Sequence, residues 1–284
     1  MKGDKKIAVI GAGMMGAEIA LAYASSGTTV LLKDIDLKTV NNGCRRVESI
    51  LNKWIDKGKI TSDRKSETIE RIIPREDYSN FDEVGLVIEA VVEDKIVKTA
   101  IFQELAAVCN DQCIISTNTS SIPVTELAHS TPRPDRFVGL HFFSPASIMK
   151  LVEVIAGIQT SDDTVKEAME IVRQAGKEPI RVKDCAGFLV NRLLFALFNE
   201  AWRAVDEGVA SPEDVDKALR LGLGYPIGIF QMQDLVGLDN ALSVSGTLYE
   251  EYGERFKPHP LLKKKVAAGH YGRKTGKGWF DYNK

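Results

Sequence analysis

The chain has 284 residues, of which 44% are hydrophobic and 27% are charged, a composition that disfavours disordered, collagen-like and coiled-coil proteins. Its 37 basic and 39 acidic side chains give a formal net charge of −2, so no overall field attracts nucleic acid or anionic lipid. The most apolar stretch, residues 188–202, is broken by polar side chains and is too short to span a bilayer. We therefore expect a small molecule as partner, and neither nucleic acid nor a membrane.

The N-terminal segment and the cysteines bear on where the protein resides. The apolar run at residues 7–10 is too short for a secretory signal, so we expect the chain to begin at Met1. The four cysteines form no CxxC pair and do not reach the density of a disulfide scaffold. We expect buried free thiols in a reducing cytoplasm.

Short apolar runs alternate with helical patterns through the first two thirds of the chain. The expected strands are residues 6–10, 29–33, 84–90, 113–116, 136–142, 150–155 and 178–182. Runs that are apolar enough to be covered on both faces and are separated by helices are typical of a parallel, doubly wound α/β sheet of the Rossmann type. Residues 37–72 predict a helical hairpin inserted between the second and third of these strands.

Only helical patterns follow Gly187. The expected helices are residues 188–207, a helix capped by Ser211 with Pro212 at its first position, residues 239–252 and residues 260–268. We therefore expect an α/β domain over residues 1–184 and an all-α domain over residues 185–284. In such proteins ligands bind at the carboxyl ends of the strands.

A glycine-rich segment lies between the first expected strand and the first expected helix. It reads Gly11-Ala12-Gly13-Met14-Met15-Gly16. A GxGxxG pattern in this context is the dinucleotide fingerprint, in which the helix N-terminus offers amide donors to a pyrophosphate. Asp34 ends the second expected strand, where a carboxylate binds ribose hydroxyls and repels a 2′-phosphate; the alternative is an aspartate that starts a turn. We expect NAD as cofactor, although the adjacent Lys33 leaves NADP open.

Six motifs in one order along the chain resemble those of the short-chain L-3-hydroxyacyl-CoA dehydrogenases. They are the glycine-rich fingerprint, STNTSS at residues 116–121, HFFSP at 141–145, MKLVEV at 149–154, GFLVNR at 187–192 and GRKTGKG at 272–278. The likeness extends over almost the whole chain, and in particular the chain resembles the bacterial 3-hydroxybutyryl-CoA dehydrogenases. The family more often has threonine at Met14, serine at Thr117 and asparagine at Ser144. We assign none of these three positions to proton or hydride transfer.

A histidine and a glutamate on successive β-like runs form the candidate catalytic pair. His141 ends an apolar strand, where a lone histidine is often only structural. Glu153 lies between Val152 and Val154 on the next run, and a carboxylate buried there needs a partner. If the two runs are neighbours, Glu153 holds one ring nitrogen of His141, fixes its tautomer and stabilises the imidazolium, while the other nitrogen faces substrate. The family resemblance implies the same pair.

Two further polar residues are candidates for contact with the reacting group. Ser120, in the polar turn after the fourth expected strand, either exchanges a hydrogen bond with the substrate oxygen or caps a helix ahead of Pro123. Asn191 interrupts an apolar helix in its first turn, where its amide either bonds the substrate or faces solvent. The resemblance implies that both residues orient the substrate hydroxyl and that Ser120 also lies in the cofactor site.

Lys53 and Lys57 share one face of the inserted hairpin, with Ser49 one turn earlier. By themselves they are solvated surface residues. The resemblance implies that these three residues bind the coenzyme A part of a thioester substrate.

Further cofactor contacts are carried over from the family alone. Glu93 and Lys98, after the third expected strand, match cofactor-contact positions, as does Lys274 in a basic tract that otherwise reads as a loose tail. The other three histidines have no partners at metal-ligand spacing, so we expect no metal site.

These observations together predict an NAD-dependent oxidoreductase. The resemblance implies that it interconverts (S)-3-hydroxybutyryl-CoA, or another short 3-hydroxyacyl-CoA, and acetoacetyl-CoA, with His141 as general acid and base and Glu153 holding its ring. We expect it to work as a homodimer through the helical domain. Two alternatives stay open: a dehydrogenase of a free hydroxy acid or sugar acid, and a non-catalytic, NAD-binding structural dimer.

Overall fold

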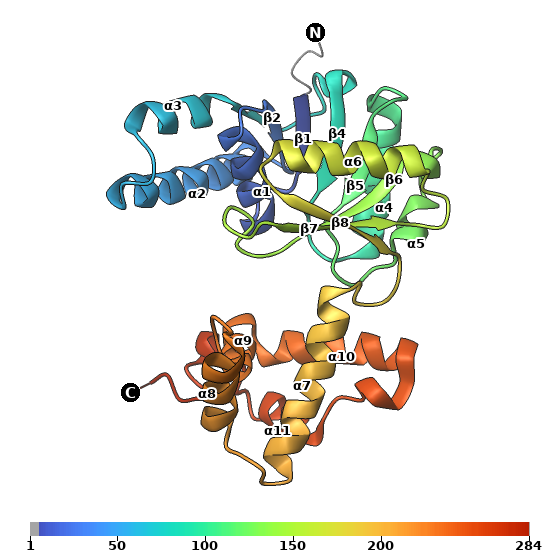
Figure 1. Cartoon of the computed structure of the whole chain (residues 1–284). Helices are drawn as coiled ribbons and strands as arrows, with labels where there is room; N and C mark the ends of the chain where they lie inside the picture. The colour runs from blue at the N-terminus through green and yellow to red at the C-terminus, as the bar shows by residue number, and fades with distance from the viewer. Residues whose placement is uncertain (1–5, 284) are drawn as a thin grey trace. The chain divides into compact units, whose positions relative to one another are not determined.

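The computed structural model describes residues 6–283, so the expected start at Met1 lies outside it. The described chain divides after Cys185 into two compact units (Figure 1). The first unit contains a mostly parallel sheet with flanking helices, and the second is helical. The expected fold class, a Rossmann-type sheet followed by an all-α region, is confirmed.

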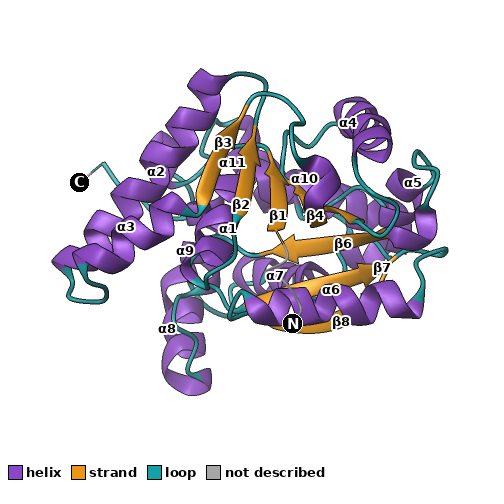
Figure 2. Cartoon of the chain, turned by 90° about the horizontal axis from the view of Figure 1, so that it is seen from above, coloured by secondary structure: helices purple, strands orange, loops and turns teal. Residues whose placement is uncertain are grey.

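The sheet has eight strands in the order β3-β2-β1-β4-β5-β6-β7-β8 (Figure 2). The strands are β1 (Lys6–Ile10), β2 (Val30–Lys33), β3 (Ile72–Arg75), β4 (Val84–Glu89), β5 (Ile114–Thr117), β6 (Phe137–Phe142), β7 (Leu151–Ala156) and β8 (Glu178–Lys183). All neighbouring pairs are parallel except β6 and β7, which are antiparallel. The first six strands in this order form a doubly wound dinucleotide-binding sheet, whose ligands lie at the carboxyl ends of the strands.

The helices of the first unit connect these strands. They are α1 (Met14–Ser25), α2 (Leu37–Asp56), α3 (Ser62–Glu70), α4 (Lys95–Val108), α5 (Val124–Ala128) and α6 (Asp162–Gln174), with short 3₁₀ turns at Phe81–Glu83 and Pro134–Arg136. The side chain of Asp36 caps α2 by accepting from the amide of Thr39, and Thr61 caps α3 by accepting from the amide of Arg64. Helices α2 and α3 extend away from the sheet as a hairpin (Figure 1).

Strand β3 is absent from the sequence-based expectation, which assigned residue 72 to the end of the inserted hairpin. Pro74 inside this four-residue run argues against a strand, because proline cannot donate to the ladder. Here β3 lies at the edge of the sheet and pairs only with β2, so the missing donor costs little. The hairpin α2–α3 is therefore the crossover that joins β2 to β3.

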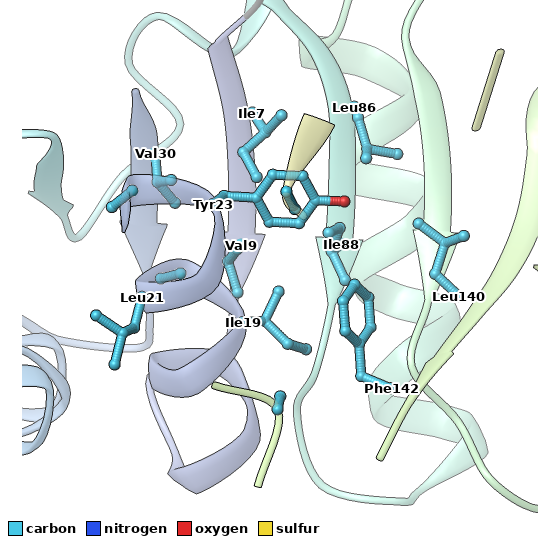
Figure 3. Packing of buried hydrophobic residues seen from close by; sticks show 14 of the residues in the cluster. Ile7, Val9, Ile19, Leu21, Tyr23, Val30, Leu86, Ile88, Leu140 and Phe142 are labelled. Atoms are coloured by element: carbon cyan, nitrogen blue, oxygen red, sulfur yellow. The ribbon is translucent and has the colours of Figure 1, made fainter. Parts of the chain in front are cut away.

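The main core of this unit lies between the sheet and the helices α1 and α6. Figure 3 shows Ile19 and Tyr23 of α1 packed over β1 and β4, with Leu140 and Phe142 of β6 beside them. Side chains alternate between the faces of a strand, so Leu140 and Phe142 point into this core and the residue between them points to the other face. That residue is His141.

The second unit is built on a buried tryptophan. Its helices are α7 (Val190–Asp206), α8 (Pro212–Leu223), α9 (Ile229–Val236), α10 (Leu238–Tyr252) and α11 (Pro260–Ala267), with 3₁₀ turns at Gly253–Phe256 and Arg273–Thr275. Trp202 is fully buried against Ile229, Phe230 and Leu248. The sequence analysis did not predict α9, a helix of eight residues between Gly228 and Gly237.

Two smaller expectations need correction. The first helix of the second unit begins at Val190 rather than at residue 188, because Phe188 has a φ of +47°, which does not continue a right-handed helix. Of the four cysteines, which we expected to be buried, Cys109 and Cys113 are buried, whereas Cys44 and Cys185 are half-buried. Within residues 6–283, no helix has both the length and the apolar character needed to cross a membrane.

Candidate active site

The three glycines of the turn between β1 and α1 have three different environments. Gly11 has a φ of +100°, and a Cβ there would lie 2.5 Å from the carbonyl oxygen of Ala90. A Cβ on Gly16 would lie 1.8 Å from the oxygen of Gly11, whereas a Cβ on Gly13 would meet no atom within 4 Å. The first and third glycines thus permit a tight turn and close packing, and the second leaves open space. This arrangement fits a pyrophosphate against the backbone.

The N-terminus of α1 is free to bind an anion. Gly13 precedes the helix and provides no side-chain cap, and the first turn contains no acidic residue. The first amides of the helix therefore remain available as donors next to the open space at Gly13. Met14 is exposed at this end, and Met15 packs partly against the core.

Asp34 lies against the glycine-rich turn. Its Oδ2 accepts a hydrogen bond from the amide of Ala12 at 2.6 Å, and its Oδ1 accepts one from the amide of Ile35 at 2.7 Å. The carboxylate is half-buried and lies at the end of β2, where the fingerprint predicts ribose contact. Lys33 is turned to Tyr78, with its Nζ 4.4 Å from the ring centroid.

Helix α2 contributes a contact that the sequence did not indicate. Gly43 is buried in this helix, and a Cβ there would lie 2.7 Å from the carbonyl oxygen of Ala12. The hairpin thus packs directly on the cofactor turn through a glycine. The only signal in the sequence was a lone glycine within a helical pattern. Such a glycine either allows close packing against a neighbour or is simply tolerated in the helix, and the pattern does not distinguish the two.

His141 and Glu153 form a hydrogen-bonded pair, as the sequence predicts for neighbouring runs. The two residues face one another in the antiparallel register of β6 and β7, and Nδ1 of His141 lies 2.7 Å from Oε2 of Glu153. Glu153 has no exposed surface, and His141 is 7% exposed. Because a carboxylate only accepts hydrogen bonds, Nδ1 carries the proton in this pair. Their catalytic role stays a prediction.

The turn after β5 brings Ser120 to the same edge of the sheet. Within this turn, the side-chain oxygen of Asn118 accepts a hydrogen bond at 2.9 Å from the amide of Phe142, the residue after His141. Ser120 is half-buried. Its amide donates to Glu93, but the structure shows no hydrogen bond between its hydroxyl group and any of residues 6–283. A hydroxyl so placed is available to a ligand oxygen.

Glu93 holds this turn in place. Its Oε1 accepts hydrogen bonds from the amides of Ser120 at 3.1 Å and Ser121 at 3.2 Å, and from the hydroxyls of Thr119 and Ser121. Burial raises the pKa of Glu93, but the Lys98 ammonium and the hydrogen bonds from Thr119 and Ser121 outweigh it and keep the pKa below its ordinary value. The carboxylate is therefore ionised and oriented at neutral pH.

Lys98, which we expected to contact the cofactor, is buried and pairs with two carboxylates. It is 1% exposed, and its Nζ lies 2.6 Å from Oε1 of the buried Glu89 and 3.2 Å from Oε2 of Glu93. Glu89 also accepts a hydrogen bond at 2.7 Å from the hydroxyl of Thr117. Lys98 thus neutralises one buried carboxylate and orients the second.

The expected substrate residues of the hairpin are exposed. Ser49 and Lys53 lie on α2, and Lys57 follows its last residue. Lys53 is ten residues beyond Gly43, which packs on the cofactor turn, so it lies about 15 Å further along the helix. An anionic group bound by these lysines would therefore be a different group from one bound at the glycine-rich turn.

The two remaining predicted residues belong to the helical unit. Asn191 is half-buried in the first turn of α7. Lys274 is half-exposed, and its Nζ donates to Oδ2 of Asp239 at 2.7 Å. Across residues 6–283, no three His, Cys, Asp or Glu side chains are grouped so as to hold a metal ion.

Two family profiles account for almost the whole chain. Residues 6–185 match the profile described as 3-hydroxyacyl-CoA dehydrogenase, NAD binding domain, and residues 187–282 match 3-hydroxyacyl-CoA dehydrogenase, C-terminal domain. The chain belongs to the 3-hydroxyacyl-CoA dehydrogenase family. It is thus an enzyme of the oxidoreductase class with an NAD-binding domain, as the sequence motifs predicted.

Members of this family match the chain from end to end. The 3-hydroxybutyryl-CoA dehydrogenase of Clostridioides difficile is 41% identical over 98% of this chain and 100% of its own length. The mitochondrial hydroxyacyl-coenzyme A dehydrogenase of Sus scrofa is 38% identical over 98% of this chain and 91% of its own length. The crystal structure of (S)-3-hydroxybutyryl-CoA dehydrogenase from Ralstonia eutropha superimposes with a TM-score of 0.95, at 41% identity, covering 99% of this chain and 100% of that one.

Proposed function

We propose that this family member interconverts (S)-3-hydroxybutyryl-CoA and acetoacetyl-CoA with NAD as the redox partner. The observation that carries the proposal is the 2.7 Å hydrogen bond between His141 and the buried Glu153 at the carboxyl end of β6. A buried imidazole–carboxylate pair in a sheet that also carries a dinucleotide turn has the chemistry of a general base for alcohol oxidation. Full-length relatives named 3-hydroxybutyryl-CoA dehydrogenase support the choice of substrate.

The proton is moved by His141. In oxidation its Nε2 accepts the proton of the 3-hydroxyl group, and in reduction it returns a proton to the oxygen at C3. NAD, when bound, takes up or supplies the hydride at that carbon. Glu153 holds Nδ1–H and stabilises the imidazolium that forms when Nε2 gains a proton. Proton transfer by a positioned group of this kind contributes about 10²–10⁴-fold to the rate.

The polar residues around the reaction are assigned to orientation and binding. Ser120 and Asn191 bond the substrate oxygen, and Ser49, Lys53 and Lys57 bind the coenzyme A moiety, whose phosphates require cationic donors. The cofactor residues are Gly11, Gly13, Met14, Met15, Gly16, Asp34, Ser120, Glu93 with Lys98 behind it, and Lys274. Asp34 accepts from the adenosine ribose hydroxyls, which favours NAD over NADP.

We assign a homodimer to the enzyme, formed through the helical unit, and a cytoplasmic location. The helical unit exposes apolar side chains that a partner copy would cover. Val209, Leu221 and Leu223 are each at least 67% exposed, and Leu235 and Val236 are more than half exposed. Sedimentation or light scattering of the purified protein tests the oligomeric state, and a monomer at micromolar concentration would contradict it.

The reaction is tested by following NADH oxidation with acetoacetyl-CoA and, separately, with free acetoacetate. We expect turnover only with the thioester. Turnover with acetoacetate alone would favour a dehydrogenase of free acids, and tight NADH binding without turnover of either compound would favour a non-catalytic dimer.

The role of His141 is tested by His141→Gln, which keeps a polar side chain but cannot carry a proton. We expect kcat to fall about a hundredfold or more with the melting temperature preserved. Glu153→Gln is the companion variant, and we expect a smaller loss, because the imidazole remains but its charge is unsupported. Activity of the His141 variant within about threefold of the parent would rule out the assigned proton transfer.

A further inference from the structure

The loop between β6 and β7 is held by two buried charged residues from distant parts of the first unit. This loop, residues 143–150, joins the strand of His141 to the strand of Glu153. Glu18 on α1 is 7% exposed, and Lys177, between α6 and β8, is 6% exposed. Both contact the loop, and we call them the loop anchors.

Each loop anchor satisfies backbone groups of opposite kind. Oε2 of Glu18 accepts hydrogen bonds from the amide of Ser147 at 3.1 Å and from its hydroxyl at 2.9 Å. Nζ of Lys177 donates to the carbonyl oxygens of Ala146 at 2.6 Å and Met149 at 2.8 Å. Because a buried charge without hydrogen-bond partners is strongly unfavourable, both anchors oppose any displacement of the loop.

The two anchor charges also act on one another. Burial lowers the pKa of Lys177, and the negative charge of Glu18 partly offsets this effect. The loop segment 146–149 thus lies in contact with both a carboxylate and an ammonium. Burial thus disfavours the Lys177 ammonium, and its hydrogen bonds to the loop and the charge of Glu18 compensate for this.

The loop anchors connect the cofactor helix to the catalytic histidine. Glu18 lies one turn inside α1, whose N-terminus follows the glycine-rich turn, and its partner Ser147 is 129 residues away in the sequence. At the start of the loop, the ring of Phe143 packs on the ring of His141 with 4.6 Å between centroids. A movement of the loop relative to α1 therefore also moves the aromatic side chain that contacts His141.

We propose that Glu18 and Lys177 are positioning residues that hold the 143–150 loop, and through Phe143 the ring of His141, in register with the cofactor helix. This inference rests on the proposed function of His141. Neither anchor contacts substrate, since both are buried beneath the loop backbone. Their effect is on the alignment of proton and hydride transfer, where a displacement of about 1 Å can cost about a hundredfold in rate.

The test compares Glu18→Ala and Lys177→Met with Glu18→Gln, which keeps an acceptor oxygen for Ser147. For the first two variants we expect kcat for acetoacetyl-CoA reduction to fall at least about tenfold, with the KM for the thioester within about threefold of the parent. The kinetic isotope effect on kcat with NADH deuterated at C4 should rise, because hydride transfer becomes more rate-limiting. Glu18→Gln should retain kcat within about threefold.

A second readout does not depend on turnover. Amide hydrogen exchange of residues 143–150 should slow when NADH binds to the parent protein, and this protection should be lost in Glu18→Ala and Lys177→Met. Lys166→Met and Glu170→Gln, at exposed positions on α6, are the matched controls and should behave as the parent. If the parent does not reduce acetoacetyl-CoA, the proposed function fails. The exchange experiment needs no turnover, so it still tests whether the loop anchors hold the 143–150 loop.

Three results would overturn the inference. The first is that both anchor variants show the same isotope effect on kcat as the parent and that NADH protects their 143–150 loop from amide exchange as it does in the parent. Another is a loss in Glu18→Gln as large as in Glu18→Ala. The third applies if the anchor variants do not fold. In that case Ser147→Ala, which removes only the hydroxyl contact with Glu18, is used instead, and an unchanged isotope effect in this variant would overturn the inference.

Discussion

The amide nitrogen of Ala12 lies 2.6 Å from Oδ2 of Asp34, so the carboxylate that follows β2 is held directly against the glycine-rich turn that follows β1. This contact fixes a negative charge at the place where the dinucleotide fold presents adenosine ribose. The charge is half-buried, so it is screened less than a surface carboxylate. We therefore predict that this residue decides the cofactor preference.

Asp34→Asn keeps an acceptor oxygen for the amide of Ala12 but removes the charge. We expect the ratio of kcat/KM for NADH to that for NADPH to fall at least about tenfold, because hydrogen bonds to a charged group contribute about 1.5–3 kcal/mol and the repulsion of a 2′-phosphate is lost. The control is Asp36→Asn two residues later, where asparagine caps α2 as well as aspartate does. An unchanged ratio in the Asp34 variant would contradict the assignment.

The two exposed lysines at the end of α2 discriminate thioester from free-acid recognition. Lys53→Glu combined with Lys57→Glu should raise the KM for acetoacetyl-CoA at least about tenfold and leave kcat at saturation within about threefold, since the lysines are remote from His141. The charge-preserving Lys53→Arg with Lys57→Arg should retain the parent KM. In the parent this KM should also rise with added salt, because exposed charges are screened. Equal KM values in the two double variants would refute the coenzyme A contact.

The buried pair of Glu89 and Lys98 predicts a measurable coupling in stability. Lys98→Met leaves Glu89 charged with no exposed surface, so the free energy of unfolding should fall by about 3–5 kcal/mol. Glu89→Gln combined with Lys98→Met removes both charges and should recover most of that loss. Lys95→Met, three residues earlier on α4 in an exposed pair with Glu126, should cost less than about 1 kcal/mol. Urea unfolding of the four proteins measures these differences, and a double variant no more stable than Lys98→Met would show that the pair is not coupled.

We expect removal of the hydroxyl group of Tyr23 to stabilise the protein. Its side chain is fully buried in the core of Figure 3, and its hydroxyl has no hydrogen-bond partner in the described part of the chain. Tyr23→Phe should therefore raise the free energy of unfolding by about 1 kcal/mol. Tyr78→Phe is the opposite control, because the hydroxyl of Tyr78 donates to Glu104 at 2.6 Å and its removal should be destabilising. A destabilised Tyr23 variant would mean that the hydroxyl is satisfied by water.

The local elements of this protein follow from short patterns. The glycine-rich segment between an apolar run and a helical pattern predicts the β1–α1 turn, and the serine and proline at residues 211–212 begin α8 as expected. Where the local signal is contradictory, as at Pro74 in the edge strand β3, the sequence does not predict the element. Edge position, which makes this proline harmless, is a property of the folded sheet.

For the candidate site too, some features follow from local sequence patterns and others only from the folded structure. The residue types and spacings by themselves determined a dinucleotide turn, an acidic residue after β2, and a histidine and a glutamate on successive strands, because periodicity and turn chemistry act over a few residues. Only the tertiary structure decided that Lys98 is buried between Glu89 and Glu93, and that Glu18 holds Ser147. The first contact joins the end of β4 and the turn after it to α4, and the second joins segments 129 residues apart. Both depend on strand register and side-chain packing, which no local pattern encodes.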